Sequence, residues 1–366
     1  MYAKCGMLEN AQKTFDELAV QNVVSWTALI TGYAQNGSGE EALYCFEQMR
    51  RDGLSPNEST FSCILKACGA VGDFWKGCEV HVEIMKAALL ERDIVIANAL
   101  VDMYAKCGDM VKAQTVFNEL SVPDVVSWST LISGYAQHLH YEQALCCFEC
   151  MKLGGGVSPN IITCVSILSA CGRLGAFSKG QRAHVCVCEA MEKNQIHYDG
   201  TAVVDMYAKC GMLENAQKLF DELAVQNVVS WIALITGYAQ NGSGEEALCC
   251  FEQMRRDGLS PNESTFSCIL KACGAVGDFW KGCEVHVEIM KAALLERDIV
   301  IANALVDMYA KCGDMVKAQT VFNELSVPDV VSWSTLISGY AQHLHYEQAL
   351  CCFECMKLGG GSLQIL

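Results

Sequence analysis

Apolar side chains recur along the chain with the spacing of an α-helix, in pairs of short segments separated by breaks. In the stretch 23–57 the first apolar stripe has the spacing i, i+3, i+4 and i+7, and its members are Trp26, Leu29, Ile30 and Tyr33. A Gly-rich break at 36–39 interrupts the helix, and a second stripe follows at Ala42, Phe46 and Met49. We therefore expect a helical hairpin in which neither helix can bury its stripe alone.

The hairpin pattern repeats in units of 35, 36 and 31 residues, always in that order. Stacked units of this kind bury their apolar faces against their neighbours. The sequence therefore predicts an all-α fold, a right-handed superhelical solenoid of helix-turn-helix repeats. The predicted units are 1–22 (partial), 23–57, 58–93, 94–124, 125–160, 161–196, 197–227, 228–262, 263–298, 299–329 and 330–366 (truncated).

A longer repeat overlies the short one. Residues 1–156 recur at 206–361 with three differences, which are Thr14 against Leu219, Thr27 against Ile232 and Tyr44 against Cys249. Such identity indicates either a recent duplication or near-identical segments joined in the gene. The chain begins and ends inside a unit, so we expect it to be cut short at both ends.

Composition excludes several classes of protein. Hydrophobic residues make up 52% of the 366, which is too many for a disordered chain. The 23 cysteines, an odd number without a visible secretory leader or transit peptide, favour free thiols in a reducing compartment. No run approaches the roughly 18 apolar residues of a membrane span, so we expect no membrane partner. The net charge of −16 argues at first sight against nucleic acid.

Three phrases recur in a fixed order along the chain: Val-Val-Ser-Trp, Ile-Leu-(Lys/Ser)-Ala-Cys-Gly and Asp-Met-Tyr-Ala-Lys-Cys-Gly. With the alternating unit lengths they resemble the P, L and S motifs of plant pentatricopeptide repeat (PPR) proteins of the PLS subfamily. By this resemblance 23–57, 125–160, 228–262 and 330–366 are P units, and 58–93, 161–196 and 263–298 are L units. The units 1–22, 94–124, 197–227 and 299–329 are S units. The tetratricopeptide repeat fits the Trp26 stripe, but its constant period of 34 residues does not fit these lengths.

The resemblance implies single-stranded RNA as the ligand, with one base for each P or S unit. In the family the second residue of a unit packs against a base, and the fifth and last residues select it. The second-position residues are Val24, Val95, Val126, Val229 and Val300. Adenine is implied by Thr27 with Asn57, Ser129 with Asn160, and Thr201 with Asn227; uracil is implied by Asn98 with Asp124, and Asn303 with Asp329. Ile232 with Asn262 departs from the pattern, and Ser334 suggests a purine. L units are left unassigned, so the hypothesis is an RNA of the form A-x-U-A-x-A-x-x-U.

These polar residues, and the Cys and His motifs of the chain, also have other interpretations. Each polar residue alone could be a helix cap or a solvated group, and only the shared register favours base selection. Cys147-x-x-Cys150 and Cys352-x-x-Cys355 have zinc-like spacing, and the sequences at His81 and His286 resemble the His-x-Glu of zinc deaminases. The Cys pairs lack the preceding proline and lie far from these histidines. We therefore expect no metal, no cofactor and no enzyme, with cysteines filling gaps between helices.

The sequence thus predicts a sequence-specific single-stranded RNA-binding array. The resemblance implies site recognition in mitochondrial or chloroplast RNA processing, or in C-to-U editing with a DYW-type deaminase acting in trans. DNA is not expected as a partner. Two alternatives stay open: a scaffold for protein–protein interaction of the tetratricopeptide type, and a gene fragment without function.

Overall fold

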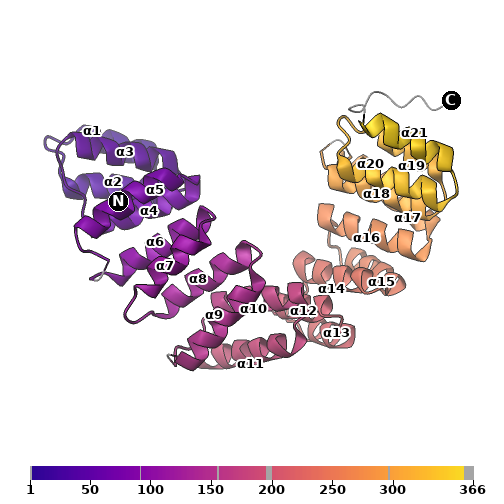
Figure 1. The fold of residues 1–366 in the computed structure, drawn as a ribbon, viewed down its shortest axis with the longest axis horizontal. Helices are drawn as coiled ribbons and strands as arrows, with labels where there is room; N and C mark the ends of the chain where they lie inside the picture. Colours follow the sequence, from indigo (N-terminus) through magenta and orange to yellow (C-terminus); the bar gives the residue numbers. More distant parts are fainter. Residues whose placement is uncertain (1, 91, 155, 195–199, 296, 358–366) are drawn as a thin grey trace. The chain divides into compact units, whose positions relative to one another are not determined.

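The computed structural model describes residues 2–90, 92–154, 156–194, 200–295 and 297–357, and the regular structure within them is helical throughout (Figure 1). A short 3-10 helix, Tyr2–Cys5, comes first. The α-helices are α1 (Leu8–Asp16), α2 (Val23–Gln35), α3 (Gly39–Arg51), α4 (Glu58–Val71), α5 (Phe74–Lys86), α6 (Ile94–Lys106), α7 (Met110–Asn118), α8 (Val125–Gln137), α9 (Tyr141–Gly154), α10 (Ile161–Leu174), α11 (Phe177–Asn194), α12 (Thr201–Lys209), α13 (Leu213–Asp221), α14 (Val228–Gln240), α15 (Gly244–Arg256), α16 (Glu263–Val276), α17 (Phe279–Lys291), α18 (Ile299–Lys311), α19 (Met315–Asn323), α20 (Val330–Gln342) and α21 (Tyr346–Lys357). No helix of the described segments is both long and apolar enough to cross a membrane.

The chain divides into two compact units. The first comprises residues 1–171 and 181–196, and the second comprises residues 172–180 and 197–366. In the first unit α2, α4, α6 and α8 contact one another in succession, and in the second α12, α14, α16, α18 and α20 do the same. The remaining helices pack on this first-helix layer, α3 against α2 and α4, and α5 against α4 and α6. Each unit is thus an all-α solenoid of helical hairpins, as expected.

The predicted apolar stripes form the core. Ile30, Phe46 and Met49 have no exposed surface. The ring of Trp26 packs edge-on against Phe15 with their centroids 4.5 Å apart, and Trp128, Trp231 and Trp333 meet Phe117, Phe220 and Phe322 in the same way. The prediction that these tryptophans pack in the core is confirmed for Trp26, Trp231 and Trp333, which are buried, whereas Trp128 is only half-buried.

A glycine sets the closest approach between first helices. A Cβ placed on Gly237 in α14 would lie 2.4 Å from the Cβ and 3.1 Å from the Cα of Ala208 in α12. Since real Cβ atoms do not approach other atoms so closely, only glycine fits at this separation. Gly134 and Gly339 meet Ala105 and Ala310 in the same register.

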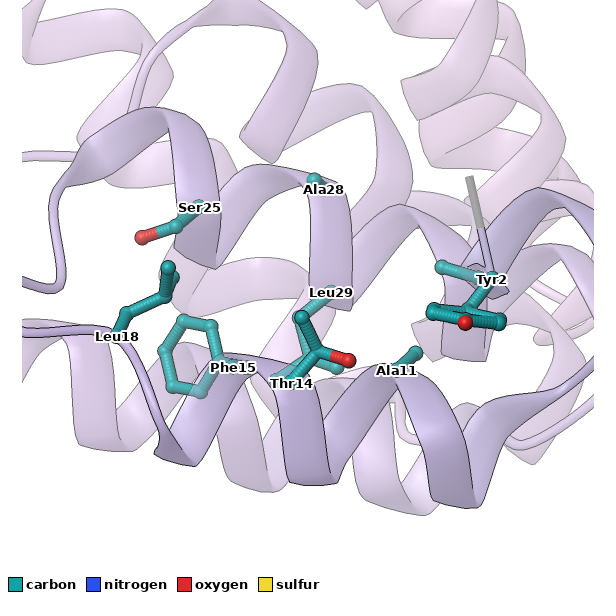
Figure 2. Close-up of a pocket in the computed structure, with 9 residues that line it drawn as sticks. Tyr2, Ala11, Thr14, Phe15, Leu18, Ser25, Ala28 and Leu29 are labelled. Atoms are coloured by element: carbon teal, nitrogen blue, oxygen red, sulfur yellow. The ribbon is translucent and has the colours of Figure 1, made fainter.

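The first hairpin of the first unit leaves part of its apolar seam open. Figure 2 shows Phe15 and Leu18 of the α1 segment facing Ser25 and Leu29 of α2, in a pocket that Tyr2 also lines. Tyr2 is 46% exposed, whereas its counterpart Tyr207 is 6% exposed and packs on Phe177. The lining of this pocket is mostly apolar and pairs no nucleophile with a base, so it does not have the chemistry of an active site.

Candidate nucleic-acid interface

A row of aliphatic side chains is exposed on the first-helix layer. Each lies at the second residue of its helix, where the chain has just entered the helix and the side chain points away from the core. The exposed fractions are 73% for Val24, 58% for Val95, 48% for Val126, 63% for Val229 and 57% for Val300. Isolated exposed valines are ordinary, but five in one register are not. We call the surface that they mark on each compact unit the first-helix face.

The residues predicted to select bases at the unit ends are all N-caps of the helix that follows. In each case the side-chain oxygen accepts a hydrogen bond from the backbone N–H three residues later, at 2.7 to 3.0 Å. The caps are Asn57, Asp124, Asn160, Asn227, Asn262 and Asp329. The alternative that these residues are caps is therefore correct, and base selection would have to use the atoms that capping leaves over.

The structure brings some of the predicted pairs into contact. The Nδ2 of Asn98 donates to Asp124 Oδ1 at 3.3 Å, and Asn303 and Asp329 repeat this contact at 3.3 Å. The Nδ2 of Asn160 donates to Ser129 Oγ at 3.4 Å. The fifth and last residues of these units thus form one polar group, although they are separated by up to 31 positions in the chain.

The first P unit reaches the same arrangement through a third side chain. The hydroxyls of Thr27 and Thr60 are 2.8 Å apart, and the Thr60 hydroxyl donates to Asn57 Oδ1 at 2.9 Å. In the duplicated unit Ile232 replaces Thr27, so this link is lost while Thr265 still donates to Asn262. That unit has no polar fifth residue, in agreement with its departure from the pattern.

Two predicted positions remain, which are Thr201 with Asn227 and Ser334. Thr201 is buried at 8% exposed, and Asn227 is half-buried at the start of α14. Ser334 is exposed, and its hydroxyl donates to the carbonyl of Val331 at 3.0 Å. The end of the Ser334 unit, residues 358–366, lies outside the described residues.

Electrostatics make Asp124 an obligate acceptor at neutral pH. Burial alone would raise the pKa of Asp124, but hydrogen bonds from Ser127 and Asn98 outweigh it and hold that pKa below its usual value. The pKa of Asp329 is likewise lowered, and the largest cause is the hydrogen bond from the backbone N–H of Ser332. The opposing amides, Asn98 and Asn303, are 9% and 8% exposed, and their Oδ1 atoms have no hydrogen-bond partner.

These aspartates predict a pH dependence of stability. Because their pKa values are lower in the folded chain, their contribution is present above the unfolded pKa of about 3.9 and is lost as pH falls through the folded pKa. Asparagine caps a helix as well as aspartate but does not titrate. We expect the double variant Asp124→Asn, Asp329→Asn to show a smaller fall in urea midpoint between pH 7 and pH 3 than the parent chain. Equal falls would contradict the assignment.

Sequence reasoning missed two sets of residues. Val331 and Ile162 are 56% and 58% exposed at the same register as the five valines. The partners of the caps, at the third helical position, were also missed, although the recurring Asn/Asp-x-x-Ser/Thr spacing signals a capping box. They are Thr60, Ser127, Thr163, Ser230, Thr265 and Ser332.

The residues of the zinc-like motifs are not arranged as a metal site within the described part of the chain. No three His, Cys, Asp or Glu side chains of the described residues are grouped as a metal site would require. His81 instead contacts the hydroxyl of Tyr104, with Nδ1 and Oη 2.8 Å apart. The expectation that cysteines fill gaps holds for Cys68 and Cys273, which are buried, but is wrong for Cys150, which is exposed on α9.

Comparison with known families decides the affiliation. The model described as PPR repeat family matches residues 21–70, 123–173 and 226–275, and the model described as PPR repeat matches residues 95–122, 201–228, 300–327 and 331–360. Together these matches cover most of the chain. The chain is a pentatricopeptide repeat protein. The assignment of its units to P, L and S types stays a prediction.

Curated relatives of this PPR protein come from Arabidopsis thaliana. A mitochondrial pentatricopeptide repeat-containing protein is 34% identical over 358 residues, covering 97% of this chain and 51% of the relative. A chloroplastic one is 36% identical over 348 residues, covering 95% of this chain and 56% of the relative. The chain thus spans about half the length of these relatives.

Solved structures agree on the fold. The pentatricopeptide repeat protein PPR10, crystallised in complex with an 18-nt psaJ RNA element, superposes with a TM-score of 0.66 at 19% identity. The match covers 99% of this PPR protein and 59% of PPR10. At this level of identity the similarity supports the helical-repeat fold alone.

Proposed function

We propose that the first-helix face binds single-stranded RNA, with one nucleotide at each predicted P or S unit. The observation that carries the proposal is the repeated grouping of an exposed valine, a polar residue three positions later and a capping Asn or Asp beside it. Val95, Asn98 and Asp124 form one such group, and Val126, Ser129 and Asn160 form another. The binding of RNA by PPR10, a protein of the same family, supports the choice of ligand.

The chemistry of each group favours a different base. The ionised Asp124 offers acceptors only, so this pair suits a base edge that presents an N–H, as uracil does at N3. A hydroxyl with an amide, as in Ser129 and Asn160, offers donors and acceptors together and suits adenine. The valine covers the base plane in either case.

Each compact unit then has its own preferred sequence. In the first unit Thr27, Asn98 and Ser129 imply A-x-U-A. In the second unit Thr201 and Asn303 imply A-x-x-U, with the position of Ile232 read weakly. Lys106, on the same helix as Asn98, is already bonded to Asp102 at 2.8 Å, so we expect base contacts to contribute more than phosphate neutralisation.

The biological setting is part of the same proposal. The mitochondrial and chloroplastic relatives suggest an organelle. The protein would select sites for RNA processing or C-to-U editing, with a DYW-type deaminase in trans as the catalytic partner.

An RNA titration tests the proposal. Labelled RNA carrying A-x-U-A or A-x-x-U is expected to bind more tightly than a G/C-substituted RNA of the same length, with affinity falling as salt rises. RNA selection on the purified chain should recover the same A/U spacing. If no RNA binds even at low salt, the protein-interaction scaffold becomes the better explanation.

A single substitution tests the base assignment. Asp124→Asn keeps the cap and adds an N–H donor in place of an acceptor. We expect the preference at that nucleotide to move from uracil toward cytosine, whose N3 is an acceptor, by roughly 1–2 kcal/mol in relative affinity. Asp329→Asn supplies the matched change in the second unit, and each should leave the preference of the other unit unchanged.

A further inference from the structure

A cysteine outside the first-helix face lies within reach of a lysine and a tyrosine. Cys78 of α5 receives hydrogen bonds at its Sγ from Lys112 Nζ at 3.5 Å and from Tyr104 Oη at 3.8 Å. The Lys112 ammonium lies 4.4 Å from the ring centroid of Phe74 and 5.5 Å from that of Tyr104. The two rings hold the cation beside the sulfur.

A histidine extends this network. His81 Nδ1 lies 2.8 Å from Tyr104 Oη. Burial lowers the pKa of His81, so its ring is neutral, and burial raises the pKa of Tyr104, so its phenol keeps its proton. If the proton of the histidine is placed on Nδ1, the bonds run in one direction, from His81 to Tyr104 and from Tyr104 to Cys78. The sulfur then accepts from both of its partners.

The second unit repeats the network, while a third position lacks it. Cys283 Sγ is 3.4 Å from Lys317 Nζ and 3.7 Å from Tyr309 Oη. In the intervening repeats Gln181 and Asn215 stand at the positions of the cysteine and the lysine. The thiol and the ammonium are thus either both present or both replaced.

We propose that Cys78 and Cys283 are thiol sites that react with peroxides. A neighbouring ammonium favours the thiolate, which is the reactive form of cysteine. Both cysteines are half-buried, and Lys112 is exposed, so a small oxidant can reach the sulfur. Cys68 and Cys164 are less reactive by comparison, since both are buried and burial raises their pKa to about 12.

The reaction is a two-electron oxidation with hydrogen peroxide as the oxidant. The Cys78 thiolate attacks one peroxide oxygen, so an S–O bond forms and the O–O bond breaks. The sulfur becomes a sulfenic acid, and the peroxide is reduced to hydroxide. The Lys112 ammonium gives the hydroxide a proton to make water and regains one from solvent. Cys283 and Lys317 perform the same step.

Labelling of the full chain measures this reactivity. Trypsin releases residues 77–86 and 282–291 with identical sequences, so their combined label counts both sites. With dilute hydrogen peroxide and dimedone at pH 7, we expect this peptide to be labelled about fivefold faster than Cys150, which is exposed but whose pKa is raised by burial, Cys146 and Glu149.

Substitution of the lysines identifies the cause. Lys112→Gln should halve the fast labelling of the shared peptide, and Lys112→Gln with Lys317→Gln should remove it. Lys106→Gln, at an exposed lysine bonded to Asp102, is the matched control and should change nothing. Cys186 contacts Lys152 at 3.1 Å but is 6% exposed, so it should stay unlabelled.

A second measurement does not depend on variants. At pH 7, iodoacetamide should alkylate the shared peptide of the parent chain faster than it alkylates Cys150. Alkylation no faster than at Cys150, or fast labelling that survives the double lysine substitution, would overturn the proposal.

Discussion

Replacing Val24, Val95, Val126, Val229 and Val300 by alanine is expected to weaken RNA binding more than a hundredfold without destabilising the protein. Val→Ala removes the equivalent of two CH₂ groups, whose complete burial would contribute roughly 1.6 kcal/mol to the binding free energy. A base covers each valine only in part, so we expect each substitution to cost about 0.6 kcal/mol. Five such losses total about 3 kcal/mol, or more than two orders of magnitude in Kd. The side chains are 48–73% exposed, so the core does not depend on them.

The chain offers a matched control for this experiment. Val111 and Val316 are 78% and 79% exposed but lie on α7 and α19, the second helices of their hairpins. Their replacement by alanine should leave both Kd and the urea midpoint unchanged. The two variants would be compared by fluorescence titration of the A/U RNA and by urea unfolding. Equal weakening by both sets would remove the first-helix face as the binding surface.

Gly237→Val is expected to be the most destabilising single substitution that we describe. The new Cβ would overlap Ala208, and its nearest backbone atom is 3.1 Å away, so a side-chain rotation cannot relieve the clash. Overpacking costs about 1–3 kcal/mol, and a contact with backbone places this variant near the upper end, about 3 kcal/mol. Because stacked repeats depend on their neighbours, the loss should spread from α12 and α14 to the adjoining hairpins of the second unit.

Gly154→Val is the control for the glycine experiment. Gly154 ends α9, and a Cβ at this residue would have no other atom within 4 Å, so valine meets no neighbour there. Urea unfolding followed by far-UV circular dichroism should show a lower midpoint for Gly237→Val and little change for Gly154→Val. A Gly237→Val midpoint equal to that of the parent would show that α12 and α14 can separate freely.

The periodic part of the structure could be predicted from the sequence. Stripe spacing alone predicts the hairpin of α2 and α3, and it places Trp26 in the core. The caps could also have been predicted, since Asn57-x-x-Thr60 is a local signal. Interpreting Asn57 through the family resemblance drew attention to base selection and away from its structural role.

Contacts between units could not be predicted in this way. The bond from Asn98 to Asp124 depends on the register between α6 and α8, which local spacing does not determine. Cys78 and Lys112 are 34 positions apart and meet only because α5 and α7 both flank α6. The general expectation that cysteines fill gaps therefore could not separate the half-buried Cys78 from the buried Cys68.

The caps join each predicted unit to the next. Asn57 closes one unit in sequence, yet its side chain holds the first turn of α4 in the following one. A change of base preference at this position is therefore also a change in the folding of a neighbour, where losing the cap costs about 1 kcal/mol. The residues that can occupy the position are limited to the good caps before any base is considered. A repeat unit that is exchanged by engineering should accordingly begin at one capping residue and end just before the next capping residue.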